Sequence, residues 1–289
     1  MIIVELVGGL GNQLFQYAIG RSLAEARQTT MKLDKSPFAT YKLHAYSLNH
    51  FSVDAMPASA SEVARFHGPG LGNRLRRLPA RLTGNPYRIV TERLQFTYDP
   101  SLLPESRNLY LRGYWQTEEY FRHVEPMLRA ELTIRTPPDR ENAALAADIA
   151  QANAVCIHVR RGDYVANAQT NSVHGACSLD YYRAAIKRMT ETVTDPKFFV
   201  FSDDPDWTRA NLQFDHLATF VSHNAADRNY EDLRLMSLCK HFIIANSTFS
   251  WWGAWLSGNE TKTVIAPMKW LQSTDLANAD LIPSSWIRL

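Results

Sequence analysis

Two adjacent arginines stand where an apolar run of the sequence ends. The run Ala154-Val155-Cys156-Ile157 predicts a buried β-strand, and His158-Val159-Arg160-Arg161-Gly162-Asp163 follows it directly. In open α/β sheets, ligands bind at the carboxyl ends of the strands. Two guanidinium groups at such a place suit a doubly charged, oxygen-rich group such as a pyrophosphate. From these residues alone, a solvated charge pair after a strand is the alternative interpretation.

Polar groups also follow two further apolar runs in the same half of the chain. The run 198–201 leads into Ser202, Asp203 and Asp204, and the run 242–245 leads into Asn246, Ser247, Thr248 and Phe249. Hydroxyl and backbone N–H groups at a helix start can face an anion. Three strand ends therefore predict one anion-binding edge.

Two familiar ligand motifs are only partly present. Asp204-Pro205-Asp206 spells the D-x-D pattern that some sugar transferases use to hold Mn²⁺. Two carboxylates alone make a poor metal site, and Pro205 favours a helix start, so we expect no metal. The turn Gly8-Gly9-Leu10-Gly11-Asn12-Gln13 resembles a dinucleotide fingerprint, but Leu14 takes the place of the third glycine, which argues against NAD. The Asn12 and Gln13 amides suit sugar hydroxyls, and Asn12 as a helix N-cap is compatible with that role.

The composition is that of an ordinary globular protein. The chain has 289 residues, of which 45% are hydrophobic and 21% charged, and its net charge is only +2, so no overall positive field points to nucleic acid. The three cysteines form no CxxC pair and fit a reducing compartment. No apolar stretch approaches the roughly 18 residues of a spanning helix, and the N-terminus lacks signal-peptide features. We expect a cytoplasmic protein.

A basic segment leaves peripheral membrane contact open. Seven arginines and a single acid, Glu92, lie between Arg65 and Arg93. Such a segment can contact an anionic membrane surface or an acidic acceptor. A solvated helix or loop face is the alternative.

The elements that would position these residues suggest two α/β halves with a cleft between them. The pair Pro137-Pro138 marks a boundary between an N-terminal domain, 1–138, and a C-terminal domain, 139–289. In the second half, strands alternate with helices, which predicts a parallel sheet covered on both faces. We expect strands near 154–160, 198–202, 219–222, 241–245 and 263–266, and helices near 179–192, 205–213, 230–239 and 247–257.

Four segments taken together resemble the α-1,2-fucosyltransferases of glycosyltransferase family 11, of bacterial type. They are Gly8 to Ala18, Leu111-Arg-Gly-Tyr-Trp-Gln116, His158-Val-Arg-Arg-Gly-Asp-Tyr164 and Asn246 to Trp255, and the resemblance runs from residue 2 to about 267. It implies an α/β fold of the GT-B class, with two Rossmann-like domains facing across a cleft. It implies inverting transfer of L-fucose from GDP-β-L-fucose to the 2-hydroxyl of a terminal β-galactose, with no cofactor and no obligatory metal.

The acceptor would be an oligosaccharide or lipid-linked glycan of surface polysaccharide or lipopolysaccharide biosynthesis. An enzyme of this kind would work in the cytoplasm, with possible contact at the inner face of the membrane. Two alternatives stay open: a GT-B transferase that uses another nucleotide sugar, and a non-catalytic carbohydrate-binding module.

The resemblance also implies roles for single residues. Asp232 falls where distant relatives read guanine, because a carboxylate accepts from guanine N1–H and N2–H₂ together. Arg160 and Arg161 would neutralise the pyrophosphate and so act in catalysis. The other donor-binding residues are His158, Asp203, Asn246, Ser247, Thr248 and Phe249, and the acceptor-binding residues are Gly11, Asn12, Gln13, Trp115 and Gln116.

The general base has no clear candidate in the sequence. The α-1,6 relatives carry a Glu shortly after the arginine pair, whereas the segment from Tyr164 to Cys177 contains no acidic residue. The remaining candidates are His174, Asp163 and Asp180.

Overall fold

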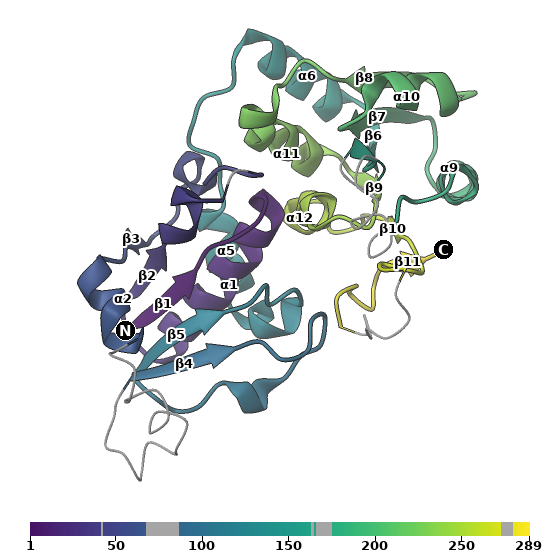
Figure 1. Cartoon of the computed structure of the whole chain (residues 1–289). Coiled ribbons are helices and arrows are strands. Elements are labelled where there is room, and N and C mark those ends of the chain that lie inside the picture. Colours follow the sequence, from purple (N-terminus) through teal and green to yellow (C-terminus); the bar gives the residue numbers. More distant parts are fainter. Residues whose placement is uncertain (42, 68–86, 163–164, 166–174, 273–279) are drawn as a thin grey trace. The chain divides into compact units, whose positions relative to one another are not determined.

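The computed structural model of the chain describes residues 1–41, 43–67, 87–162, 165, 175–272 and 280–289. The chain divides into two compact units (Figure 1). The first unit is Met1–Arg135, and it also includes Asp280 and Leu281. The second unit begins at Thr136, slightly before the expected boundary, and includes Ile282–Leu289. The chain therefore passes between the units more than once.

The first unit is built on a five-stranded parallel sheet with the strand order β3-β2-β1-β5-β4. Its strands are β1 Ile2–Glu5, β2 Met31–Asp34, β3 Met56–Pro57, β4 Tyr87–Thr91 and β5 Asn108–Arg112. Its helices are α1 Leu10–Ala26, α2 Ala60–His67 and α5 Glu125–Glu131, with short 3₁₀ turns at Ser36–Ala39, Leu48–His50, Pro100–Leu102, Glu118–Tyr120 and Arg122–Val124.

Two glycines allow helix α1 to follow β1 so closely. Gly8 has φ +82° at the turn between them, a conformation that side chains rarely adopt. On α1, a Cβ at Gly20 would lie 2.5 Å from Cγ2 of Val4, so only glycine lets the helix pack this tightly on the strand. A strand, a glycine-rich turn and a helix thus follow one another here.

The second unit is built on a six-stranded parallel sheet with the order β11-β10-β9-β6-β7-β8. Its strands are β6 Asn153–Val159, β7 Pro196–Ser202, β8 Ala218–Val221, β9 His241–Ile243, β10 Val264–Ala266 and β11 Ile287–Arg288. Its helices are α6 Arg140–Gln151, α9 Leu179–Thr192, α10 Pro205–Asn211, α11 Asn229–Leu238 and α12 Thr248–Leu256, with a 3₁₀ turn at Ala226–Arg228. Every strand and helix expected in this half occurs, which confirms the α/β prediction.

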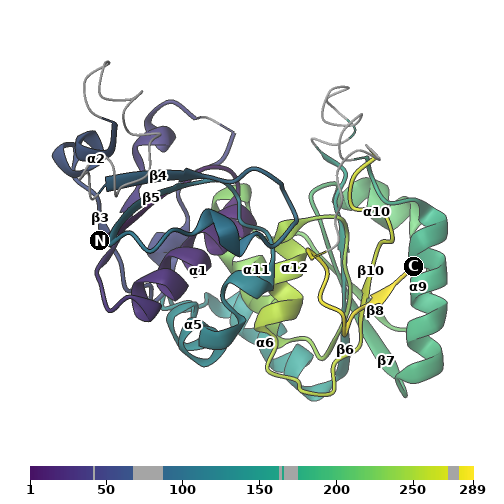
Figure 2. The same ribbon diagram turned by 90° about the horizontal axis from the view of Figure 1, so that it is seen from below.

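The two faces of β6 carry different chemistry. Val155, Ile157 and Val159 pack on one face against α9, through Tyr182 and Met189 among others. The alternate residues of the strand point to the other face, which α6, α11 and α12 cover (Figure 2). A side chain of β6 that points to that face and binds a ligand there therefore lies beneath α11 or α12.

The order of the strands creates a switch point between β6 and β9. From β6 the chain continues to β7 and β8 on one side, and then returns to place β9 on the other side. Ile157 pairs with Ile243, so the carboxyl ends of β6 and β9 lie side by side. Ligands of open α/β sheets bind outside the strands at such a point.

Within the described part of the chain, no helix is both long enough and apolar enough to cross a membrane.

Candidate functional site

The arginine turn, Arg160 to Gly162, leaves β6 at the switch point and is held by Asp203 at the end of β7. The Asp203 carboxylate accepts the N–H of Arg161 at 2.8 Å and the N–H of Gly162 at 3.0 Å. One of its oxygens also lies 3.1 Å from Nη1 of Arg160. Asp203 was expected among the donor contacts, but here its oxygens hold the turn that presents the arginines.

The Arg161 side chain is oriented by helix α10. Its guanidinium carbon lies 3.4 Å from the centre of the Trp207 ring, and its Nε lies 3.4 Å from Oδ2 of Asp204. Asp204 itself caps α10, because its carboxylate accepts the N–H of Trp207 at 3.3 Å. Stacking and pairing together keep the planar guanidinium in one orientation, which suits recognition of a bidentate oxyanion.

The D-x-D pattern forms a helix start. Asp204 is engaged as the cap, whereas the Asp206 side chain is 99% exposed and lies 3.6 Å from Arg209. Within the described ranges, no group of three or more His, Cys, Asp or Glu side chains could hold a metal ion. Metal independence of the reaction stays a prediction.

His158 has the features of a ligand-binding residue. It is only 4% exposed, and among the described residues nothing hydrogen-bonds its buried Nδ1. Burial, helped by the charge of Arg160, lowers the pKa of His158 to about 3, so the imidazole is neutral. A buried polar atom without a partner costs free energy, and a ligand that supplies the missing bond removes that cost.

The start of α12 lies beside the arginine turn, because β9 pairs with β6. Ser247 caps this helix, with its hydroxyl accepting the N–H of Phe249 at 3.3 Å. The Phe249 ring lies 5.8 Å from that of His158. Thr248 is the first residue of the helix. Asn246 plays a different part, because its amide donates to the carbonyls of Gly175 and Trp270 and so joins two loops.

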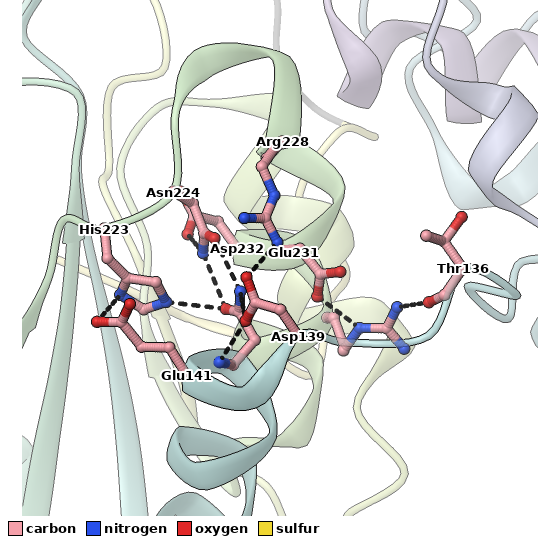
Figure 3. A network of polar contacts seen from close by, with 10 residues as sticks. Thr136, Asp139, Glu141, His223, Asn224, Arg228, Glu231 and Asp232 are labelled. Carbon is pink, nitrogen blue, oxygen red and sulfur yellow. Dashed lines mark hydrogen bonds and ion pairs between the residues drawn. The ribbon is translucent and has the colours of Figure 1, made fainter.

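Asp232 lies half-buried on α11, over the polar face of β6. Helix α11, which carries Asp232, covers the face of β6 to which Cys156 and His158 point. Oδ1 of Asp232 accepts a hydrogen bond of 2.8 Å from Nδ2 of Asn224 (Figure 3). Burial raises the pKa of Asp232 to about 6, against the opposing effects of Asn224 and His223. Asp232 is thus a carboxylate that the fold keeps at some cost.

Among the three candidates for a general base, Asp180 is the one that lies within the described residues. Asp163 and His174 lie outside the described residues. Asp180 is in the first turn of α9, with its side chain 90% exposed and 3.1 Å from Arg183. That position is typical of a solvated ion pair.

The first unit brings two of the predicted acceptor residues together. Oδ1 of Asn12 accepts a hydrogen bond of 2.8 Å from Nε2 of Gln116, although 104 residues separate them in the chain. Both follow strand ends, of β1 and β5 respectively. Gly9 takes the N-cap position of α1, so Asn12 is not the cap, and Gly11 is buried inside the helix. The Asn12–Gln116 amide pair therefore joins the start of α1 to the segment that follows β5.

Gln13 and Trp115 are placed differently from the expectation. Gln13 is fully buried, and its amide bonds to the backbone of Gly8, Ala45 and Ser47, so its polar atoms already have partners. Trp115 is also fully buried, with its ring edge-on to Tyr120 at 5.6 Å. Its indole therefore presents no face for a galactose to stack on.

Sequence reasoning missed the residue that shapes the Trp115 turn. Trp115 has φ +58°, an uncommon backbone conformation for a non-glycine residue. Glu92 supports it by accepting the N–H groups of Tyr114 at 2.7 Å and Trp115 at 3.0 Å. Burial raises the pKa of Glu92, against the effect of these two hydrogen bonds. Only its position among the arginines of 65–93, as their single acid, set it apart in the sequence.

A sequence model described as Glycosyl transferase family 11 matches residues 85–289. The chain belongs to glycosyl transferase family 11. An Escherichia coli relative named Alpha-1,2-colitosyltransferase is 33% identical over 295 residues, which cover 100% of this chain and 99% of the relative. Another from Escherichia coli, named O-antigen biosynthesis glycosyltransferase WbnK, is 29% identical over 98% of this chain and 99% of its own length.

The solved structures add evidence on the fold. The crystal structure of NodZ alpha-1,6-fucosyltransferase soaked with GDP-fucose has a TM-score of 0.52 to this chain at 16% identity, and covers 88% of this chain and 92% of that one. This similarity supports the GT-B class for the two parallel α/β units. The family and the fold class expected from the motifs are confirmed, and the substrate contacts of single residues stay predictions.

Proposed function

We propose that this family 11 glycosyltransferase transfers L-fucose from GDP-β-L-fucose to the 2-hydroxyl of a terminal β-galactose, with inversion. The observation that carries the proposal is that one unit holds the arginine turn, His158, whose Nδ1 has no hydrogen-bond partner among the described residues, and the half-buried Asp232. Two arginines suit a pyrophosphate, and a carboxylate suits the two donors of guanine. The names of the relatives, an α-1,2 transferase and a fucosyltransferase soaked with GDP-fucose, point the same way.

The main catalytic effect would be stabilisation of the departing GDP. Negative charge develops on the leaving pyrophosphate, and preoriented positive groups lower the barrier because they need no rearrangement during the reaction. Arg161 is held in place by Trp207 and Asp204, and Arg160 by Asp203. The N-terminus of α12 adds donors beside them. These groups supply positive charge at the pyrophosphate, so we expect no obligatory metal.

On the acceptor side, the proposal assigns Asn12 and Gln116 to the galactoside. Amide groups suit sugar hydroxyls by their chemistry, and this pair joins two strand ends of the first unit, whereas Gln13 and Trp115 hold the surrounding loops. The name of the second relative favours a surface-polysaccharide intermediate as acceptor. Such an acceptor would place the enzyme in the cytoplasm, at the inner face of the membrane.

A second candidate function is α-1,2 transfer of colitose, since a relative of that name matches the full length of the chain. The base and pyrophosphate contacts would be the same, and the two reactions would differ only in the sugar. Colitose transfer is thus one case of the alternative left open by the sequence, a GT-B transferase that uses another nucleotide sugar.

The deciding experiment is incubation with a β-galactoside and either GDP-L-fucose or GDP-activated colitose, with GDP release and the product linkage measured. We expect release with GDP-L-fucose, an α-1,2 product by NMR, and unchanged rates in EDTA. Preference for the colitose donor would select the second function. Galactoside binding without release of any nucleotide would indicate a carbohydrate-binding module. Loss of transferase activity in EDTA, restored by Mn²⁺, would contradict the expected metal independence.

A further inference from the structure

Two asparagines far apart in the sequence form a reciprocal pair, and one of them, Asn224, lies next to Asp232 (Figure 3). Nδ2 of Asn142, on α6, donates to Oδ1 of Asn224 at 2.9 Å, and Nδ2 of Asn224 donates back to Oδ1 of Asn142 at 3.0 Å. The second N–H of Asn224 reaches Oδ1 of Asp232 at 2.8 Å. Only the NH₂ end of an amide can face a carboxylate, so this arrangement has one orientation.

The pair is anchored at both ends. Asp139, the N-cap of α6, accepts the backbone and side-chain N–H groups of Asn142 at 2.9 and 3.0 Å, and it pairs with Arg228 at 2.7 Å. His223 lies 3.0 Å from Oδ1 of Asn142 through its Nε2. Asn142 is fully buried. The amide of Asn224 is therefore held in place by the anchored side chain of Asn142 as well as by Asp232.

We propose that Asn224, held by Asn142, is a positioning residue that fixes the carboxylate plane of Asp232 and thereby sets the preference for guanine. The inference rests on the proposed role of Asp232 in reading the base. The terminal torsion of an aspartate is broad, so an unsupported carboxylate samples many orientations. Simultaneous contact with N1–H and N2–H₂ requires one orientation. Oδ1 can accept the Asn224 bond and a ligand bond together, because each carboxylate oxygen has two lone pairs.

The same contact sets the pH range of binding. The titratable and charged groups that face Asp232 are Glu231 on its own helix, His223 after β8 and Cys156 on β6, with Asp139, Glu141, Arg228 and Arg234 around them. Protonated Asp232 cannot accept from both guanine donors, so GDP affinity should fall as the pH drops through about 6. The Asn224 hydrogen bond lowers the pKa of Asp232, so its removal should move this fall to higher pH.

The experiment is calorimetry of GDP and inosine diphosphate binding between pH 5 and 8. Inosine diphosphate lacks the N2 amino group, so the ratio of the two affinities reports the double contact. We expect wild-type protein to prefer GDP by about tenfold, and Asn224→Ala to lose most of that preference with its pH midpoint raised. Asn142→Ala should act in the same direction more weakly. Asn259→Ala, which removes a hydrogen bond to the Lys240 carbonyl elsewhere in the unit, should change neither quantity.

The two proposals fail in different ways. If Asp232→Asn binds GDP as well as wild type does, the guanine assignment is wrong and the proposed function loses its base reader. If Asp232→Asn loses GDP but Asn224→Ala keeps both the preference and the midpoint, the positioning role is wrong. If Asn224→Ala does not fold, Asn224→Leu, which keeps a similar volume but has no donor, replaces it, and an unchanged ratio and midpoint there would equally overturn the role.

Discussion

At the scale of single residues, Asp232 should make the fold less stable at neutral pH. Its pKa is about 6 in the folded protein against an ordinary value of 3.8, so the folded state binds the proton more tightly than the unfolded state does. Stability therefore decreases as the pH rises from about 4 to 6, and the penalty is fully present above that range. A residue kept at this cost is more easily explained by binding than by folding.

Replacing Asp232 by Asn should consequently stabilise the second unit while weakening GDP binding. We expect a gain of about 1–3 kcal/mol at pH 7.5, since one pKa unit corresponds to 1.36 kcal/mol. The gain should shrink as the pH approaches 4, where the wild-type carboxyl is protonated in the folded protein. Thermal melts of both proteins at the two pH values measure it. A variant less stable than wild type at pH 7.5 would contradict the argument.

Arg161 should matter for transfer far more than for folding. In Arg161→Ala the stacked guanidinium is lost, and we expect kcat to fall about a hundredfold or more, with the circular dichroism spectrum unchanged. Arg161→Lys is the matched control, because it keeps the charge but loses the planar fork, and it should recover only part of the rate. Turnover like that of wild type in folded Arg161→Ala would remove the pyrophosphate site from this turn.

At the scale of elements, the arginine turn depends on a glycine that fits under Asp203. A Cβ at Gly162 would lie 2.9 Å from Oδ2 of Asp203, closer than ordinary contacts allow, so Gly162→Ala should displace the carboxylate that holds the turn. We expect transfer to fall by about tenfold or more, because small misplacements of catalytic groups are costly. Gly258→Ala is the control, since a Cβ there meets nothing within 4 Å. Equal rates in both variants would show that the turn tolerates the change.

The strands and helices of the second unit could be predicted because their signal is local. Apolar runs such as 198–201 and the polar groups that follow them lie within a few residues of each other, and parallel strands bring their carboxyl ends to one edge. The switch point between β6 and β9 then placed the arginine turn beside α12. The residue types, the periodicity of apolar residues and the positions of the strand ends were therefore sufficient to predict this part of the site.

Side-chain roles could not be predicted where they depend on distant partners. The amide of Gln13 has the chemistry to bind a sugar, but it forms hydrogen bonds with the backbone of Ala45 and Ser47. No local sequence pattern predicts these partners. The residue type of Trp115 favoured stacking on a sugar, but in the structure its ring is buried against Tyr120 in a turn with positive φ. Asn142 and Asn224 are 82 residues apart and belong to no recognisable motif.

At the scale of the whole molecule, the tryptophans allow the second unit to be followed almost alone. Trp115 belongs to the first unit, and the other six of the seven, Trp207, Trp251, Trp252, Trp255, Trp270 and Trp286, belong to the second. Tryptophan fluorescence therefore reports mainly on the unit proposed to bind GDP, whereas far-ultraviolet circular dichroism reports on both.

GDP should accordingly raise the melting temperature seen by fluorescence. At a hundredfold excess over Kd the stabilisation should be about 2.7 kcal/mol. A galactoside alone should leave the fluorescence transition in place, since its proposed contacts are in the first unit. If GDP shifted a melting transition seen by circular dichroism but left the fluorescence transition unchanged, GDP would bind the first unit, and the proposed nucleotide site in the second unit would be wrong.

The return of the chain near its C-terminal end limits how family members could exchange their donor specificity. Asp280 is bound to the first unit through the backbone of Phe96 and Tyr98, whereas β11 completes the sheet of the second. A chimera with a single crossover near Arg135 would thus transplant a foreign segment into the recipient's first unit. Recombination that keeps both units whole needs three junctions, one at 135/136 and one on each side of the first unit's C-terminal segment, which ends at Leu281. Point changes around the sugar are therefore a shorter evolutionary route than domain exchange.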